Sequence, residues 1–254
     1  MLLEAKEITK DFGGLRAVDK FSLEIHKKEL IGLIGPNGAG KTTVFNLLTG
    51  VYEPTSGYIK LKGEDITGEK PHQITQLGMA RTFQNIRLFK EMSVLSNVLV
   101  AKHFSVGYGL FGAVIRSAMY YKEEARIKKE AEELLERFGL SDKIHLPAGS
   151  LPYGEQRKLE IVRALATNPD ILLLDEPAAG MNPTETMELM ELIKRIRNDF
   201  ELAILLIEHD MKFVMGLSEK LVVLDYGKII AKGKPDVVKN DPKVIEAYLG
   251  EIEE

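Results

Sequence analysis

The feature that most constrains this chain is a glycine-rich stretch between an apolar run and an amphipathic segment. It reads Gly35-Pro36-Asn37-Gly38-Ala39-Gly40-Lys41-Thr42. The apolar residues 30–34 before it predict a buried strand, and residues 43–48 after it predict a helix. The glycines let backbone N–H groups converge on phosphate oxygens, and a helix N-terminus adds unpaired donors and partial positive charge. This strand, loop and helix context predicts a site for a nucleoside triphosphate.

Within this loop, two side chains have the chemistry to contact the phosphates and their cation. Lys41 can reach the β- and γ-phosphates, and the hydroxyl of Thr42 is the expected Mg²⁺ ligand. A glycine-rich turn that contains Lys-Thr by chance is the alternative, and the flanking strand and helix disfavour it. The nucleotide-binding residues predicted here are Gly35, Pro36, Asn37, Gly38, Ala39, Gly40, Lys41, Thr42 and Thr43.

Composition excludes several other classes of protein. The formal net charge of −4 over 254 residues argues against a chain-wide basic surface for nucleic acid. No apolar run approaches the roughly 18 residues of a membrane span, and the N-terminus lacks a signal-peptide pattern. With no cysteine there is no disulfide framework, no cysteine-ligated zinc and no thiol nucleophile. We therefore expect a soluble cytosolic protein.

Two kinds of strand pattern predict two kinds of sheet. Phe21, Leu23 and Ile25 alternate with polar residues, and residues 57–62 behave likewise, which favours an antiparallel sheet with one wet face. Residues 31–35, 171–175 and 203–208 are apolar without alternation and favour a parallel sheet covered on both faces. A hairpin is predicted around Asp225-Tyr226-Gly227, between residues 221–224 and 228–231.

Between about 88 and 150 the pattern becomes helical. One apolar stripe comprises Ile127, Ala131, Leu134, Leu135 and Phe138. Glu124 and Lys128, four residues apart, are expected on the exposed side, and Gly139 is a plausible C-cap. Residues 107–112 predict a mobile loop. We expect one domain, 1–254, whose parts are an antiparallel sheet with the phosphate loop (1–87), a helical lobe (88–165), and the rest of the core with a C-terminal helix (166–254).

A second apolar strand ends in two carboxylates. Residues 171–174 are all apolar, and Asp175 and Glu176 follow them. In an open parallel sheet, ligands bind at the carboxyl edge, where these side chains emerge. Asp175 suits Mg²⁺ coordination beside Thr42, and Glu176 suits a general base that polarises the attacking water. A plain strand end before Pro177 is the alternative, and the upstream phosphate loop disfavours it.

Several motifs, in order, resemble the ATP-binding cassette ATPases and together span nearly the whole chain. They are Phe12 with Val18 nearby, Gln84 in Arg81-Thr82-Phe83-Gln84-Asn85, residues 151–156, residues 178–182, and His209. The resemblance implies an α/β fold: a P-loop NTPase core with a mixed sheet, an N-terminal antiparallel β-subdomain and an inserted α-helical lobe. It also implies that Phe12 stacks on adenine, that Gln84 contacts Mg²⁺ and the nucleophilic water, and that His209 is the switch histidine. The implied ligands are ATP and Mg²⁺.

The resemblance further implies that a second ATPase subunit, a paralogue or a second copy, closes the site in trans. The residues implied for this are Pro152, Tyr153, Gly154, Glu155 and Gln156. They depart from the usual Leu-Ser-Gly-Gly-Gln, because Pro152 replaces the serine, Tyr153 the first glycine and Glu155 the glutamine. Proline removes a hydroxyl and a backbone N–H, but it suits the first turn of the following helix.

The ending, residues 240–251, and the insert around 107–121 resemble the larger ATPase subunit of branched-chain amino acid importers. That resemblance implies integral-membrane permease subunits as partners, a substrate-binding protein indirectly, no nucleic acid, and a place at the cytoplasmic face of the membrane. Residues 87–92 are predicted to receive a coupling helix from a membrane subunit. The alternatives are a lipid or lipopolysaccharide exporter ATPase, a soluble regulatory module, and a phosphoryl-transfer kinase or GTPase; the last lacks an Asn-Lys-x-Asp motif here.

Overall fold

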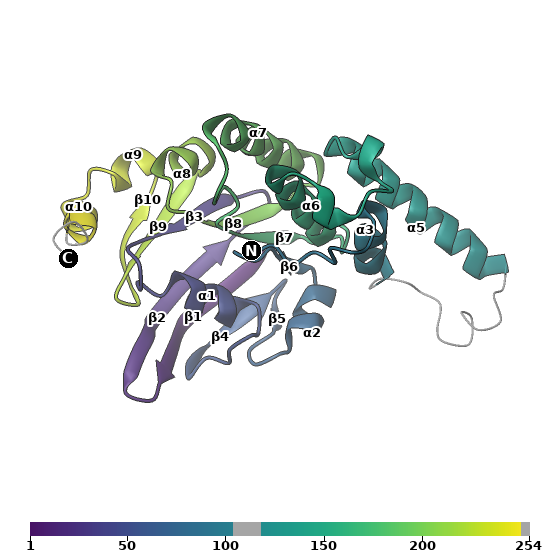
Figure 1. Ribbon diagram of the computed structural model, residues 1–254. Coiled ribbons are helices and arrows are strands. Elements are labelled where there is room, and N and C mark those ends of the chain that lie inside the picture. Colours follow the sequence, from purple (N-terminus) through teal and green to yellow (C-terminus); the bar gives the residue numbers. More distant parts are fainter. Residues whose placement is uncertain (104–117, 250–254) are drawn as a thin grey trace. The chain divides into compact units, whose positions relative to one another are not determined.

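The computed structural model describes residues 1–103 and 118–249, and the chain divides into two compact units (Figure 1). The first unit comprises Met1–Gln84 and Asp170–Glu254, and the second comprises Asn85–Pro169. The loop expected at 107–112, most of the insert at 107–121 and the last residues of the tail lie outside the described residues. The division of the chain at 88–165 stays a prediction.

The first unit contains a four-stranded antiparallel sheet in the order β2-β1-β4-β5. Its strands are β1 (Leu3–Phe12), β2 (Leu15–Ile25), β4 (Ser56–Leu61) and β5 (Glu64–Asp65). Phe21, Leu23 and Ile25 of β2 are buried while Glu24 is exposed, as the alternating pattern predicted. One face of this sheet therefore belongs to the core.

A six-stranded sheet in the order β10-β9-β3-β8-β7-β6 forms the other layer of this unit. Its strands are β3 (Leu30–Ile34), β6 (Met79–Arg81), β7 (Ile171–Asp175), β8 (Ala203–Ile207), β9 (Lys220–Asp225) and β10 (Lys228–Gly233). All neighbours pair in parallel except β10, which returns antiparallel from β9. Every residue of β3, β7 and β8 is buried, so these strands are covered on both faces as predicted.

Helices cover the six-stranded sheet on both sides (Figure 1). The helices of the first unit are α1 (Lys41–Leu48), α2 (Pro71–Gln76), α7 (Pro183–Asp199), α8 (Met211–Leu217), α9 (Pro235–Val238) and α10 (Pro242–Leu249). One core cluster joins α1 to both sheets, and another joins the sheet to α8, α9 and α10. The helix after the phosphate loop is anchored in the core by its apolar face. The residues of α1 buried in the first cluster are Val44, Phe45, Leu47 and Leu48.

The second unit is helical. Its helices are α3 (Val94–Lys102), α5 (Ala118–Arg137) and α6 (Tyr153–Leu165), with short 3₁₀ turns at Ser141–Lys143 and Ala148–Ser150. The predicted apolar stripe of α5 is buried, and Gly139 has the positive φ, +70°, of a helix C-cap. Glu124 is half-buried rather than fully exposed, because its carboxylate lies 3.0 Å from Nε2 of His103.

Candidate active site

The phosphate loop runs from β3 to α1 with backbone angles that only glycine adopts freely. Gly35, Gly38 and Gly40 have φ of +150°, +76° and +100°. A Cβ on Gly35 would lie 2.0 Å from the carbonyl oxygen of Leu224, and one on Gly40 would lie 2.6 Å from that of Ala17. Backbone carbonyl groups therefore lie directly against the loop at Gly35 and Gly40, where a side chain would clash.

Lys41 holds the loop in this shape. Its ammonium group is buried and donates hydrogen bonds of 2.7 Å to the carbonyl oxygens of both Gly35 and Pro36. As the first residue of α1, Lys41 places its charge at the helix N-terminus, where anions are favoured. The side chain thus adds a full positive charge to the partial charge of the helix end.

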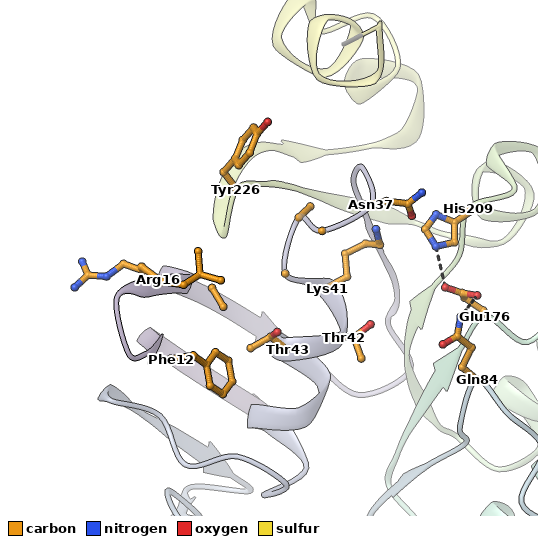
Figure 2. A pocket seen from close by; sticks show the side chains of 15 residues that line it. Phe12, Arg16, Asn37, Lys41, Thr42, Thr43, Gln84, Glu176, His209 and Tyr226 are labelled. Atoms are coloured by element: carbon orange, nitrogen blue, oxygen red, sulfur yellow. Dashed lines mark hydrogen bonds and ion pairs between the residues drawn. The ribbon is translucent and has the colours of Figure 1, made fainter. Parts of the chain in front are cut away.

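A cavity of about 520 Å³ opens over this loop. Figure 2 shows Phe12 at one end of it, Lys41 and Thr42 in the middle, and Glu176 at the other end. Its lining consists of Phe12, Leu15, Arg16, Ala17, Asn37, Gly38, Ala39, Gly40, Lys41, Thr42, Thr43, Gln84, Glu176, His209 and Tyr226. The volume falls within the range of about 300–1,000 Å³ that holds small ligands and cofactors.

Glu176 receives a hydrogen bond on each carboxylate oxygen (Figure 2). Nε2 of Gln84 donates to Oε2 at 2.8 Å, and Nε2 of His209 lies 2.8 Å from Oε1. An ionised carboxylate can only accept, so a hydrogen bond here requires the imidazole proton on Nε2. The two neighbours fix the orientation of a carboxylate that is 16% exposed at the cavity wall.

The backbone at Glu176 is itself unusual, since its φ of +47° lies in the left-handed region. A non-glycine residue there carries strain on the order of 1–3 kcal/mol, and such strain gathers at functional sites. The amide of Glu176 continues the pairing of β7 with β8 through a 2.9 Å hydrogen bond to Ile207. The turn therefore redirects the side chain toward the cavity while the strand stays paired.

A second carboxylate, Glu208, lies buried behind this cluster. It accepts the backbone N–H of Ala178 at 2.7 Å and that of His209 at 3.0 Å. Burial raises the pKa of Glu208 above its ordinary value. The hydrogen bonds from these N–H groups lower the pKa in part, and the negative charge of Glu176 raises it further. Glu208 thus joins the segment after Glu176 to the segment that carries His209.

The end of the cavity at Phe12 is aromatic. Phe12 is 41% exposed and meets Tyr52 edge-on, with ring centroids 5.2 Å apart. Nζ of Lys10 lies 5.2 Å from the Phe12 centroid, a cation–π contact. A partly exposed ring of this kind offers a surface on which a flat base can stack.

Sequence reasoning missed four lining residues: Leu15, Arg16, Ala17 and Tyr226. Tyr226 lies in the turn of the β9–β10 hairpin, which the sequence did predict, and Gly227 there donates to the carbonyl of Ala39 at 2.9 Å. The sequence signal that could have pointed to Tyr226 is the predicted hairpin turn. In the structure its two turn residues, Tyr226 and Gly227, have φ of +42° and +77°. Its proximity to the phosphate loop depends on the order of strands β9 and β3, which the sequence does not reveal.

Several predicted residues are not brought to the cavity wall. Val18 is fully buried in the core, because it occupies an inward position of β2. Gly35 and Pro36 hold Lys41 instead of lining the cavity. Asp175 is also buried, and its carboxylate forms an ion pair of 2.7 Å with Arg81.

The residues predicted to act in trans belong to the second unit. Tyr153, not Pro152, is the first residue of α6, so the expectation that proline opens the first turn is wrong by one position. Pro152 is the extended N-cap, and its carbonyl accepts the N–H groups of Glu155 and Gln156 at 3.0 and 2.9 Å. Proline is tolerated there because the N-cap N–H makes no helical hydrogen bond.

The donor set suits Mg²⁺ held together with a nucleotide. Among the residues that the structure describes, no group of three or more His, Cys, Asp or Glu side chains gathers as a metal site. The predicted protein ligands are the carboxylate of Asp175, the hydroxyl of Thr42 and the side-chain amide of Gln84, all of which offer hard oxygen donors. Mg²⁺ is usually bound through one or two such groups, with water and phosphate oxygens as its remaining ligands.

The chain is similar to known ATP-binding proteins over nearly its whole length. Residues 18–179 match the ABC transporter family, and residues 228–254 match the branched-chain amino acid ATP-binding cassette transporter family. The high-affinity branched-chain amino acid transport ATP-binding protein LivG of Salmonella typhimurium is 49% identical, with 98% of each chain covered. BraF of Pseudomonas aeruginosa, of the same description, is 46% identical over 98% of each chain. A crystal structure of an ATP-binding cassette in its ADP conformation has a TM-score of 0.85 at 33% identity, covering 98% of each chain.

Proposed function

The chain belongs to the ATP-binding cassette transporter family as an ATPase, and we propose that it energises a membrane importer of branched-chain amino acids. The observation that supports the cargo most strongly is full-length similarity to LivG and BraF, reinforced by the separate match of residues 228–254. These relatives favour the importer over the alternative of a lipid or lipopolysaccharide exporter.

We propose that hydrolysis proceeds at the Glu176 end of the cavity. Glu176 takes a proton from the attacking water while the new bond to the γ-phosphorus forms and the bond to the β-phosphate oxygen breaks. His209 and Gln84 keep the carboxylate oriented, and Lys41 with the loop N–H groups stabilises the phosphate charge. Thr42, Gln84 and Asp175 would hold Mg²⁺ together with ATP, and the ion would supply further charge neutralisation.

A second ATPase subunit is part of the proposal. We propose that residues 152–156 of a paralogue or second copy complete the site, so that ATP favours a closed dimer and hydrolysis releases it. Light scattering on Glu176→Gln tests this, because a variant that binds but does not hydrolyse ATP should accumulate the dimer. A variant that stays monomeric with ATP demonstrably bound would contradict self-dimerisation and point to an obligatory paralogue.

The proposed membrane contact is residues 87–92 of the second unit. Phe89 is 47% exposed although its backbone is fixed, since its N–H and carbonyl both bond to the side chain of Asn97 at 3.0 Å. The guanidinium of Arg163 lies 5.0 Å from the Phe89 ring. A rigidly held, exposed aromatic side chain is typical of a protein contact. The described residues contain no helix long and apolar enough to cross a membrane. From the similarity to LivG and BraF we propose that the chain acts at the cytoplasmic face of permease subunits, served by a substrate-binding protein.

Uptake of labelled leucine in the source organism tests the proposed cargo. Deleting the gene should lower uptake, and the unchanged gene should restore it, whereas the Glu176→Gln gene should not. Uptake of a sugar in the same cells serves as the control. Leucine uptake that is unaffected by the deletion would contradict the proposal, and a membrane-lipid defect in its place would favour the exporter alternative.

A further inference from the structure

Arg81 has an environment that phosphate binding does not explain. It ends β6, three residues before Gln84, and its side chain is 8% exposed. Nη2 donates to Oδ2 of Asp175 at 2.7 Å, while Nη1 donates to Oδ1 of Asn46 at 2.7 Å and to the Thr49 hydroxyl at 3.3 Å. One buried cation therefore joins the end of β7 to helix α1.

The guanidinium group is also held by aromatic rings. Its central carbon lies 5.4 Å from the ring centroid of Phe45 and 5.5 Å from that of Phe83. Both rings contribute cation–π attraction and exclude water from the ion pair. Because the planar fork of arginine fits this arrangement of acceptors and rings, a lysine would keep the charge and lose the geometry.

The chain after Arg81 is aligned with the end of β7 residue by residue. The N–H of Thr82 donates to the carbonyl of Leu173 at 2.9 Å, and the Thr82 hydroxyl accepts the N–H of Asp175 at 3.3 Å. Two residues later, Gln84 donates to Glu176. The segment that carries Gln84 is thus anchored to the two carboxylates through Arg81 and Thr82.

A buried ion pair by itself is weak evidence for a role in stability, because the loss of hydration offsets the attraction. Here the pair has a chemical consequence. Arg81 engages Oδ2 of Asp175, so it fixes the plane of the carboxylate and leaves Oδ1 as the oxygen that Arg81 does not engage. Hydrogen-bonding partners of a metal-ligating carboxylate orient it and tune its affinity for the metal.

We propose that Arg81 is a positioning residue that fixes the Asp175 carboxylate for Mg²⁺ and ties that orientation to the Gln84 segment. This inference rests on the proposed role of Asp175 as a Mg²⁺ ligand. Arg81 itself touches neither the nucleotide loop nor the reacting atoms, so its effect is exerted through Asp175.

The test measures how nucleotide affinity depends on Mg²⁺, by titrating a fluorescent ATP analogue in EDTA and across a Mg²⁺ series. Arg81→Lys should raise the Mg²⁺ concentration for half-maximal binding by about 10-fold or more, the usual cost of losing such a partner. Affinity in EDTA should be unchanged, because Lys41 and the loop are untouched. Arg197→Lys changes a half-buried arginine that pairs with Glu219 at 2.7 Å, away from Asp175, and should match the parent in both.

Two further variants keep the test decisive if Arg81→Lys folds poorly. Asn46→Ala removes one anchor of the guanidinium group and should shift the Mg²⁺ dependence in the same direction by less. In an Asp175→Asn background, adding Arg81→Lys should change the Mg²⁺ dependence by under about 2-fold, because the partner is already lost.

The possible outcomes distinguish a failure of the positioning role of Arg81 from a failure of the Mg²⁺-binding role of Asp175. If Asp175→Asn leaves the Mg²⁺ dependence unchanged, the metal role of Asp175 fails and the inference fails with it. If Asp175→Asn shifts it while Arg81→Lys and Asn46→Ala do not, only the inference is overturned. Equal losses of affinity in EDTA and in Mg²⁺ would show that Arg81 is merely structural, which also overturns it.

Discussion

Glu208 shows how single residues in this protein support the site from behind. Its buried carboxylate accepts the N–H groups of Ala178 and His209, so it fixes the backbone on both sides of the Glu176 cluster. Burial raises its pKa, which means that folding disfavours the ionised form and that those N–H groups offset part of the cost. The motifs predicted roles for Glu176 and His209. Glu208 is only the last residue of an apolar run in the sequence, and the fold is needed to show that it contacts the backbone of Ala178 and His209.

Two glycines test the geometry of the phosphate loop at the residue scale. Both Gly40→Ala and Gly63→Ala force a side chain into the left-handed region, at a cost of about 1–2 kcal/mol each. Only at Gly40 would the new Cβ also meet a carbonyl oxygen, that of Ala17, at 2.6 Å, whereas Gly63 has nothing within 4 Å. Isothermal titration should therefore show ATP affinity lowered by about 10-fold or more in Gly40→Ala and within about 2-fold of the parent in Gly63→Ala. Equal affinities in the two variants would contradict this account of the loop.

His103 predicts a small pH dependence of stability in the second unit. Its pKa is raised chiefly by the hydrogen bond to the carbonyl of Leu99, with partial burial opposing and Glu124 adding to the rise. A raised folded-state pKa gives stability that is full below pH 6.5 and is lost as pH rises through the folded value.

Thermal unfolding at pH 6 and pH 8.5 measures this effect in the parent and in His103→Ala. The parent should lose more stability between the two pH values than the variant, by no more than about 2 °C in Tm because the pair is partly exposed. Glu124→Gln should show an intermediate loss. A His103→Ala protein with the same pH dependence as the parent would contradict the assignment.

At the scale of elements, the sequence predicted strands best where their periodicity was unambiguous. The alternating residues of β2 and the continuous apolar runs of β3, β7 and β8 gave the correct sheet types, because burial on one or two faces dictates these patterns. The Arg81–Asp175 pair had no such signal. This ion pair joins residues 94 positions apart, which the pairing of β6 with β7 brings together. The periodicity of a single segment does not predict which strands are neighbours in a parallel sheet.

Phe89 provides a prediction at the element scale, since residues 87–92 form one anchored segment. Phe89→Ala should leave ATP hydrolysis by the isolated subunit within about 2-fold and lower leucine uptake in complemented cells by about 5-fold or more, because the lost ring belongs to the proposed membrane contact. Tyr121→Ala, which removes another exposed aromatic side chain of the second unit, should affect neither. Normal uptake with Phe89→Ala would exclude this segment as a major contact.

At the scale of the whole molecule, the site combines parts that the sequence separates widely. The loop at 35–41, the Gln84 segment, the end of β7 and the residues that follow β8 are four regions that the six-stranded sheet aligns at its carboxyl edge. Motif order predicted that these regions meet, and the strand order explains how. The sequence could not give the inner contacts among them, such as the hydrogen bonds on both oxygens of Glu176, because these depend on the register of neighbouring strands.

The central claim is that this cavity binds ATP and that Glu176 acts as the base. Steady-state phosphate release by Glu176→Gln, measured at an ATP concentration shown by titration to saturate the variant, tests it most directly. The account predicts saturable ATP binding close to that of the parent and phosphate release lowered by about 100-fold or more. Phosphate release near the parent rate would remove Glu176 from the base role, and lost ATP binding would show that the residue is needed for the shape of the site.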